Sequence, residues 1–210
     1  DLEVEIFSYG NAIAGIDYVA PQRWFTYPAG DTSMAIPVIP IPDEVVESAD
    51  SIVFSLLQVN CPNTVMKRDD HDAIALFIAD DDSALISIAA DSPVDENIQQ
   101  AGFTLSTSKA FDVPVLVYYS LSGTATNGAD FSVAPAPLLL QPMANQAHIP
   151  ATIFDDDIIE GTETITLTID SIMHGSADID PLHASASIGI EDNDFVALSV
   201  SSSVRVPERG

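Results

Sequence analysis

The sequence predicts an all-β protein that folds as an antiparallel sandwich or barrel, and three observations support this fold class. Apolar residues alternate with polar ones in short runs, which is the period of a half-buried strand. Turn-forming clusters separate these runs at the spacing of about 8–12 residues that is typical of antiparallel folds. No segment keeps a helical period between helix caps, so we do not expect the crossover helices that a parallel α/β fold needs.

The alternating runs define the expected strands in order along the chain. The first run is formed by Leu2, Val4 and Ile6, and later runs of the same spacing are Val115, Val117, Tyr119 and Ile165, Leu167, Ile169. Val, Ile and Thr dominate these runs, and such β-branched residues suit a pleated, half-buried surface. The turn clusters between the runs are Pro28-Ala-Gly, Ser122-Gly, Asn127-Gly and Gly175-Ser.

The composition restricts the class of partner. The chain has 210 residues, with 32 Asp and Glu against six Lys and Arg, and a formal net charge of −26. With 47% hydrophobic residues it is too apolar for a disordered acidic tail. Its charge excludes nucleic acid and anionic lipid, which attract Lys and Arg, and favours cations. No apolar stretch approaches about 18 residues, so we expect no direct membrane insertion. No signal peptide is recognisable, so a secreted protein would carry its signal outside this chain.

The chain contains an internal repeat. The segment GNAIAGIDY at 10–18 matches GTATNGADF at 123–131, and IPDEVVESADSIVF at 41–54 matches FDDDIIEGTETITL at 154–167. Both pairs are 113 residues apart, and the acidic triplets at 80–82 and 192–194 are 112 apart. Several blocks in nearly one register indicate a tandem module.

The repeat predicts three parts. Residues 1–82 are expected to form a module without its first strands, 83–194 a complete module, and 195–210 the first strand of a third. The third part is expected because Val196-Ala-Leu-Ser-Val-Ser resembles Ser83-Ala-Leu-Ile-Ser-Ile, and Val206-Pro-Glu resembles Val94-Asp-Glu. We therefore interpret the chain as a window of a longer array.

The acidic blocks predict a cation site. Strand ends of a sandwich gather at two poles, so carboxylates distant in sequence are expected to meet at one of them. Two like charges about 4 Å apart repel by roughly 4 kcal/mol at an effective dielectric near 20. Ca²⁺ takes six to eight oxygen ligands in flexible geometry and fits better than Mg²⁺. A solvated loop would explain one acidic run, but the recurrence one module later favours a site. An EF-hand is excluded because Ile159 stands at the fifth loop position, which needs an oxygen ligand.

These residues resemble the Calx-β family, a module of the sodium–calcium exchanger's regulatory region and of large surface adhesins. The matching motifs are G-x-A-x-x-G-x-D-[FY], the block D-x-x-x-E-x-x-[ED] before an apolar strand, and the closing acidic triplet. The resemblance implies tandem seven-stranded antiparallel sandwiches of immunoglobulin-like type. It also implies Ca²⁺ at one pole, where one module joins the next.

The resemblance also implies the ligands. In the complete module they are Glu96, Asp130, Asp156, the carbonyl of Ile158, Glu160, Glu163, Asp192 and Asp194. In the first module they are Asp17, Asp43, Glu47, Asp50, Asp80, Asp81 and Asp82. Glu208 is the matching glutamate of the third part. Two departures stand out: Asn193 replaces an acid, and Pro42 stands where the complete module has Asp155.

The expected function is that of a calcium-binding structural repeat in an extracellular adhesin or surface filament, where Ca²⁺ at the module junctions stiffens the array. The alternatives are a calcium-sensing regulatory module of a transporter or receptor, and an accessory region of a secreted enzyme. We do not expect this chain to be an enzyme, because it lacks a G-x-S-x-G elbow. The expected partners are neighbouring modules and an unidentified protein or glycan. The irregular stretches 60–73 and 171–183 are the expected contact loops, and Cys61 is expected to be a lone thiol.

Overall fold

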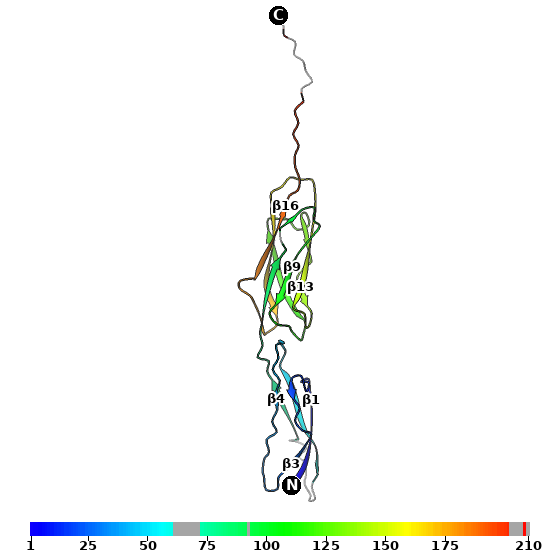
Figure 1. Ribbon diagram of the computed structural model, residues 1–210, viewed down its shortest axis with the longest axis vertical. Coiled ribbons are helices and arrows are strands. Elements are labelled where there is room, and N and C mark those ends of the chain that lie inside the picture. Colours follow the sequence, from blue (N-terminus) through cyan, green and yellow to red (C-terminus); the bar gives the residue numbers. More distant parts are fainter. Residues whose placement is uncertain (61–71, 92, 202–207, 209–210) are drawn as a thin grey trace. The chain divides into compact units, whose positions relative to one another are not determined.

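The computed structural model describes residues 1–60, 72–91, 93–201 and 208, and all regular elements in these residues are β-strands (Figure 1). The all-β prediction is therefore confirmed. The chain divides into two compact units. The first unit comprises Asp1–Ala84, Ser108–Pro114 and Gln141–Ala144, and the second comprises Leu85–Thr107, Val115–Leu140 and Asn145–Gly210. No helix long and apolar enough for a membrane crossing occurs in the described part of the chain.

One sheet of the second unit carries the strands that the alternating sequence predicts. Its order is β12 (Leu138–Leu140), β10 (Val115–Gly123), β14 (Glu163–Met173), β16 (Ser185–Glu191) and β8 (Val94–Asp95). The long strands pair antiparallel, and the two-residue strand β8 pairs parallel with the end of β16.

The other sheet of the second unit has the order β11 (Phe131–Val133), β13 (Gln146–Ile153), β9 (Gln100–Thr107), β7 (Ala84–Ala90) and β15 (Ala177–Ile179). Strand β15 lies inside the stretch 171–183, which the sequence analysis expected to be irregular throughout. That expectation is wrong for residues 171–173, which end β14, and for β15, because both join sheets through backbone pairing.

The core of the second unit lies between its two sheets. Val117, Leu167 and Ile188 from one sheet and Phe103 and Leu105 from the other are fully buried. Along β14 the burial alternates, with Ile165, Leu167 and Ile169 inside, as their spacing predicts. Each such side chain contributes about 1.5–3 kcal/mol relative to an exposed one. Packing of alternating residues therefore holds the strand ends, and the acidic segments that follow them, in place.

The first unit has one full sheet and a shorter second layer. The sheet has the order β3 (Trp24–Tyr27), β1 (Leu2–Gly10), β5 (Asp50–Asn60) and β6 (Ala73–Ile78), and the second layer has β2 (Tyr18–Val19) and β4 (Ile39–Pro40). Ile6, Tyr18, Val46 and Ile52 form its core. On β6, Ile74 remains 62% exposed, because the second layer does not reach it. Cys61 and most of the stretch 60–73 lie outside the described residues.

The two units share local irregularities as well as strand order. The β1–β5 register shifts between Glu5 and Ile6, and the β10–β14 register shifts between Tyr118 and Tyr119. These bulges are 113 residues apart, which is the spacing of the sequence repeat. Each strand then ends at a glycine with positive φ, Gly10 (149°) or Gly123 (129°).

We predict that Gly123→Ala destabilises the second unit. Its φ of 129° disfavours any residue with a Cβ, and a Cβ there would overlap the Thr164 carbonyl oxygen. The expected loss is about 2 kcal/mol or more in the free energy of unfolding, measured by urea denaturation with circular dichroism. Gly175→Ala is the control, because no atom lies within 4 Å of its Cβ position and its φ is not positive. Equal denaturation midpoints for the two variants would contradict this account.

Candidate metal centres

Acidic side chains gather where strands end in the second unit. Asp130, Glu160 and Glu163 each place a carboxylate oxygen within 4.8 Å of the others. A second group, made of Glu96, Asp192 and Asp194, is equally close. The structure thus brings together residues from four segments that are far apart in the sequence.

Backbone hydrogen bonds hold the carboxylates of the second unit in place. Asp130 closes the turn at Gly128 by accepting a hydrogen bond from the Thr126 N–H at 2.5 Å. Asp192 accepts from the N–H of Glu160 at 2.7 Å and from the N–H of Asp194 at 2.8 Å. Asp192 therefore links the acidic block before β14 to the triplet that follows β16.

Glu96 reaches this cluster because the chain leaves β8 beside β16. Its N–H donates to the Glu191 carbonyl at 3.0 Å, which continues the parallel pairing of the two strands. Glu96 is only 5% exposed, so its carboxylate is drawn away from water. Burial, together with the negative charges of Asp156 and Asp192, raises the pKa of Glu96.

The cluster of the second unit carries negative charge that the described residues do not neutralise. The Oδ2 atom of Asp194 is buried and has no hydrogen-bond partner in the described part of the chain. Burial and the neighbouring Asp130 raise the pKa of Glu163 to about 7. A buried carboxylate oxygen without a partner is costly, so this site fits a cation. The donors are all hard oxygens, which Ca²⁺ prefers.

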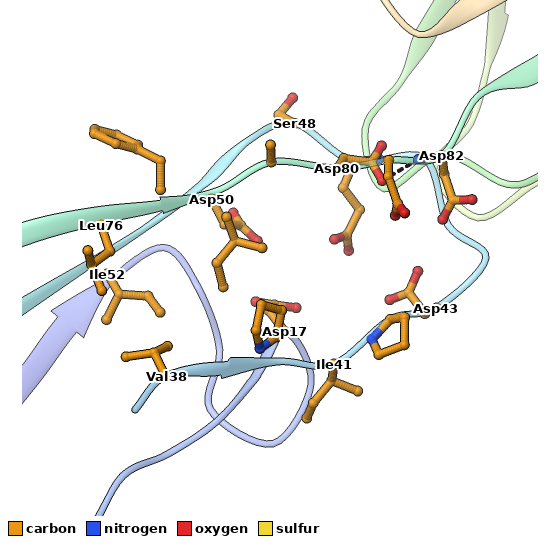
Figure 2. Close-up of a pocket in the computed structure, with 17 residues that line it drawn as sticks. Asp17, Val38, Ile41, Asp43, Ser48, Asp50, Ile52, Leu76, Asp80 and Asp82 are labelled. Atoms are coloured by element: carbon orange, nitrogen blue, oxygen red, sulfur yellow. Dashed lines mark hydrogen bonds between the residues drawn. The ribbon is translucent and has the colours of Figure 1, made fainter. Parts of the chain in front are cut away.

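The first unit repeats this arrangement (Figure 2). Asp17, Glu47 and Asp50 form one close group, and the triplet 80–82 forms another. Figure 2 shows Asp17, Asp50 and Asp80 around one cavity, to which Glu47 also contributes. Asp80 accepts from the N–H of Glu47 at 2.8 Å and from the N–H of Asp82 at 3.0 Å, as Asp192 does in the second unit. Asp17 accepts from the Ile13 N–H at 2.5 Å, as Asp130 does from Thr126.

Three of the expected ligands lie outside the four groups. Asp43 accepts a hydrogen bond from the Val45 N–H at 2.8 Å, and Asp156 accepts one from the Ile158 N–H at 2.7 Å. These two aspartates occupy equivalent turns, 113 residues apart, and Asp43 lines the cavity of Figure 2. Asp156 is near enough to raise the pKa of Glu160, although burial is the larger cause. Ile158 has a 58% exposed side chain.

Sequence reasoning missed two charged residues at the first unit's cluster. Lys109, in the segment Ser108–Pro114 of this unit, places its Nζ 2.8 Å from the Glu44 carboxylate and also contacts Asp82. Asp112 of the same segment raises the pKa values of Glu47 and Asp50, after burial and nearer acids. No sequence signal connects this segment to the first repeat, because it stands between β9 and β10 in the chain.

Comparisons with known proteins agree on one family. The family model described as the Calx-beta domain matches residues 4–82 and 79–194. Adhesion G-protein coupled receptor V1 of Danio rerio is 21% identical over 220 residues, covering 95% of this chain and 3% of that protein. The chain therefore spans a small part of that relative.

Among solved structures, two with Calx in their descriptions are similar to this chain. The apo-form Calx CBD1 domain has a TM-score of 0.45 and 21% identity, and the match covers 52% of this chain and 99% of that one. CBD12 from CALX1.2 has a TM-score of 0.41 and 15% identity, covering 90% of this chain and 87% of that one.

We predict that the protein in a calcium chelator loses thermal stability as pH rises from about 4.5 to 7. The pKa of Glu47 and that of Glu163 are raised from 4.5 to about 7 in the fold, mainly by burial. The folded state therefore binds protons more tightly than the unfolded state, so stability is highest below pH 4.5 and falls through pH 7. Calorimetry across this range measures the effect.

Glu163→Gln should flatten this pH dependence, because the amide does not titrate. Glu3→Gln, an exposed substitution on β1, is the matched control and should keep the slope. A melting temperature that rises between pH 4.5 and 7 in chelator would contradict the assignment.

Proposed function

The chain belongs to the Calx-beta domain family, and on this premise we propose that it is a calcium-binding structural repeat. The observation that carries the proposal is the pair of carboxylate groups present in each unit at equivalent positions. The unpartnered, buried Oδ2 of Asp194 adds to it, because a divalent cation would supply the missing partner. The proposed role is one of binding and structure, not of catalysis.

In this proposal each unit's own residues prepare the site. Asp192 in the second unit and Asp80 in the first use their oxygens to fix the backbone of the acidic block. Glu163 and Asp50, at the start of β14 and β5, hold carboxylates at the ends of rigid strands. Bound Ca²⁺ would neutralise the repulsion among these groups, which is roughly 4 kcal/mol for two charges about 4 Å apart.

We place the protein in an extracellular adhesin or surface filament, with neighbouring modules and a surface protein or glycan as partners. Two observations support this. The relative from Danio rerio is named as an adhesion receptor. The closing triplet 80–82 precedes β7 by a single residue, so an ion bound there would order the chain between the repeats. Extracellular calcium would then act as a permanent structural part that stiffens the array.

We predict that Ca²⁺ raises the melting temperature of the chain by about 5–10 °C at a hundredfold excess over Kd. Ligand binding to the folded state then adds about 2.7 kcal/mol. Asp192→Asn should weaken calcium binding in titration calorimetry at least tenfold, because Asp192 belongs to a carboxylate group and orders the block around Glu160. Asp178→Asn, in the exposed part of β15, should bind like the parent chain.

The affinity separates the proposed role from the alternative. Dissociation constants of tens of micromolar or weaker support the structural repeat in a calcium-rich medium. Submicromolar, cooperative binding would instead identify a calcium-sensing regulatory module of a transporter or receptor. Absence of any binding heat and of any shift in melting temperature would overturn both.

We predict that calcium narrows the conformational range of the chain in solution. Small-angle X-ray scattering should give a better-defined maximum dimension with calcium than with EDTA. Asp82→Asn should reduce this difference, because it alters the triplet that leads into β7. Identical scattering curves in the two conditions would contradict the stiffening role while leaving calcium binding intact.

A further inference from the structure

The same acidic residues surround spaces of very different size in the two units. In the first unit the cavity has a volume of about 480 Å³ and is lined by Asp17, Glu47, Asp50 and Asp80 (Figure 2). In the second unit the equivalent space is about 10 Å³. The lining residues correspond one to one, except that Glu96 closes the space in the second unit and has no counterpart in the first.

The cavity continues into an apolar face that only the first unit leaves open. Ile52 pairs with Leu76 across β5 and β6, and Phe54 pairs with Ile74, so these four side chains share one face of the sheet. Leu76 is 37% exposed, and Ile74 is 62% exposed. Figure 2 shows Leu76 beside Ile52 at the apolar end of the cavity.

The second unit shows what covers this face in a full sandwich. Ile188 on β16, at the position of Leu76, is completely buried. The opposing sheet with β7 and β9 supplies the cover, with Ile86 and Leu105 also completely buried. The segment that follows β7 then brings Glu96 to the carboxylates. The cover and the glutamate therefore belong to one stretch of chain, β7 to Glu96.

The chain carries a second version of that stretch at 195–208. Continuing the 112-residue spacing of the closing triplets places Leu198 on Ile86 and Glu208 on Glu96. Val196, Leu198 and Val200 then take the positions of Ala84, Ile86 and Ile88, the inward-facing residues of β7. The 113-residue spacing of the sequence analysis would instead place Ser199 and Ser201 inside, so the shorter spacing is the structurally correct one.

This second version is fully available for pairing. Val196 is 64%, Leu198 91% and Val200 101% exposed, and residues 195–201 form no strand. Their apolar residues alternate with Ala197, Ser199 and Ser201, which is the pattern of a half-buried strand. Glu208 is exposed as well.

We propose that residues 195–201 of a second copy of this chain cover the open face of the first unit, and that Glu208 of the second copy enters the cavity beside Asp80 and Asp82. The backbone of β6 supports this: among described strands it pairs only with β5, whereas β16 also pairs with β8. Added strands of this kind bind through main-chain hydrogen bonds and alternate side chains.

The two halves of this association respond differently to calcium. Burial of Val196, Leu198 and Val200 is an apolar contribution that does not need the ion. Glu208 adds a further negative charge to an acidic cavity, so its entry requires a cation there and rests on the proposed calcium function. Because the two contact surfaces are different, the association is head-to-tail and gives rings or open chains.

Sedimentation velocity of the 210-residue chain tests the proposal over about a hundredfold range of concentration, in EDTA and in calcium. We expect the mean mass to rise above the 22.3 kDa of the monomer with concentration, and to rise further in calcium. Leu198→Asp should abolish association in both conditions. Leu182→Asp is the matched control, because Leu182 is 85% exposed but lies outside the proposed contact.

Glu208→Gln separates this inference from the calcium proposal. This variant should associate like the parent chain in EDTA and lose the calcium enhancement. If the chain binds no calcium, the comparison of Leu198→Asp with Leu182→Asp in EDTA still tests the strand contact. A monomer at all concentrations, or association unaffected by Leu198→Asp, would overturn the inference.

A cysteine pair identifies the contact directly. In a Cys61→Ser background, Leu76→Cys in one copy and Leu198→Cys in another should form a mixed disulfide on oxidation. Copies carrying Leu182→Cys in place of Leu198→Cys should not. Equal crosslinking of the two pairs, or crosslinking only within single chains that carry both cysteines, would contradict pairing between copies.

Discussion

Like-charge repulsion at the ends of the strands is the constraint on which the rest of this structure depends. The sheets of each unit must bring carboxylates together, because alternating apolar residues such as Ile165 and Ile188 fix where the strands end. The acidic block and the closing triplet then share one pole, and Asp192 joins them through backbone N–H groups. The fold is therefore stable as a sandwich yet strained by charge at one end. Metal binding is the simplest physical relief of that strain, and it makes the acidic composition a requirement of the site.

The two units resolve this constraint by different means. In the second unit the cluster is closed, with Glu96 buried and one oxygen of Asp194 left without a protein partner. In the first unit the cavity is open, and the ammonium group of Lys109 contacts Asp82 and Glu44. Equivalent ligands thus stand in unequal electrostatic and solvent environments. The two clusters are expected to differ in their affinity for the same ion, although their sequences align closely.

Local pattern and repetition predicted most of the fold and much of the site. The spacing of Val115, Val117 and Tyr119 was sufficient to place a strand and its buried face, because the period of two is a local property. The recurrence of acidic blocks predicted which carboxylates meet. Sequence did not predict strand β15, whose order depends on pairing with a distant edge, or the approach of Lys109 and Asp112. Such contacts arise from tertiary packing, and they leave no periodic trace in the chain.

The matched bulges after Glu5 and Tyr118 bear on how such a module is inherited. A strand that gains or loses one residue exchanges its inner and outer faces, so each bulge must be copied with its surroundings. The repeat spacing nevertheless changes from 113 to 112 between β5 and β6, after Asp50 and before Ile78, where no pairing is disturbed. Duplication followed by drift is thus free to change length in a connecting segment, while the paired strands and the metal-facing ends keep a fixed count.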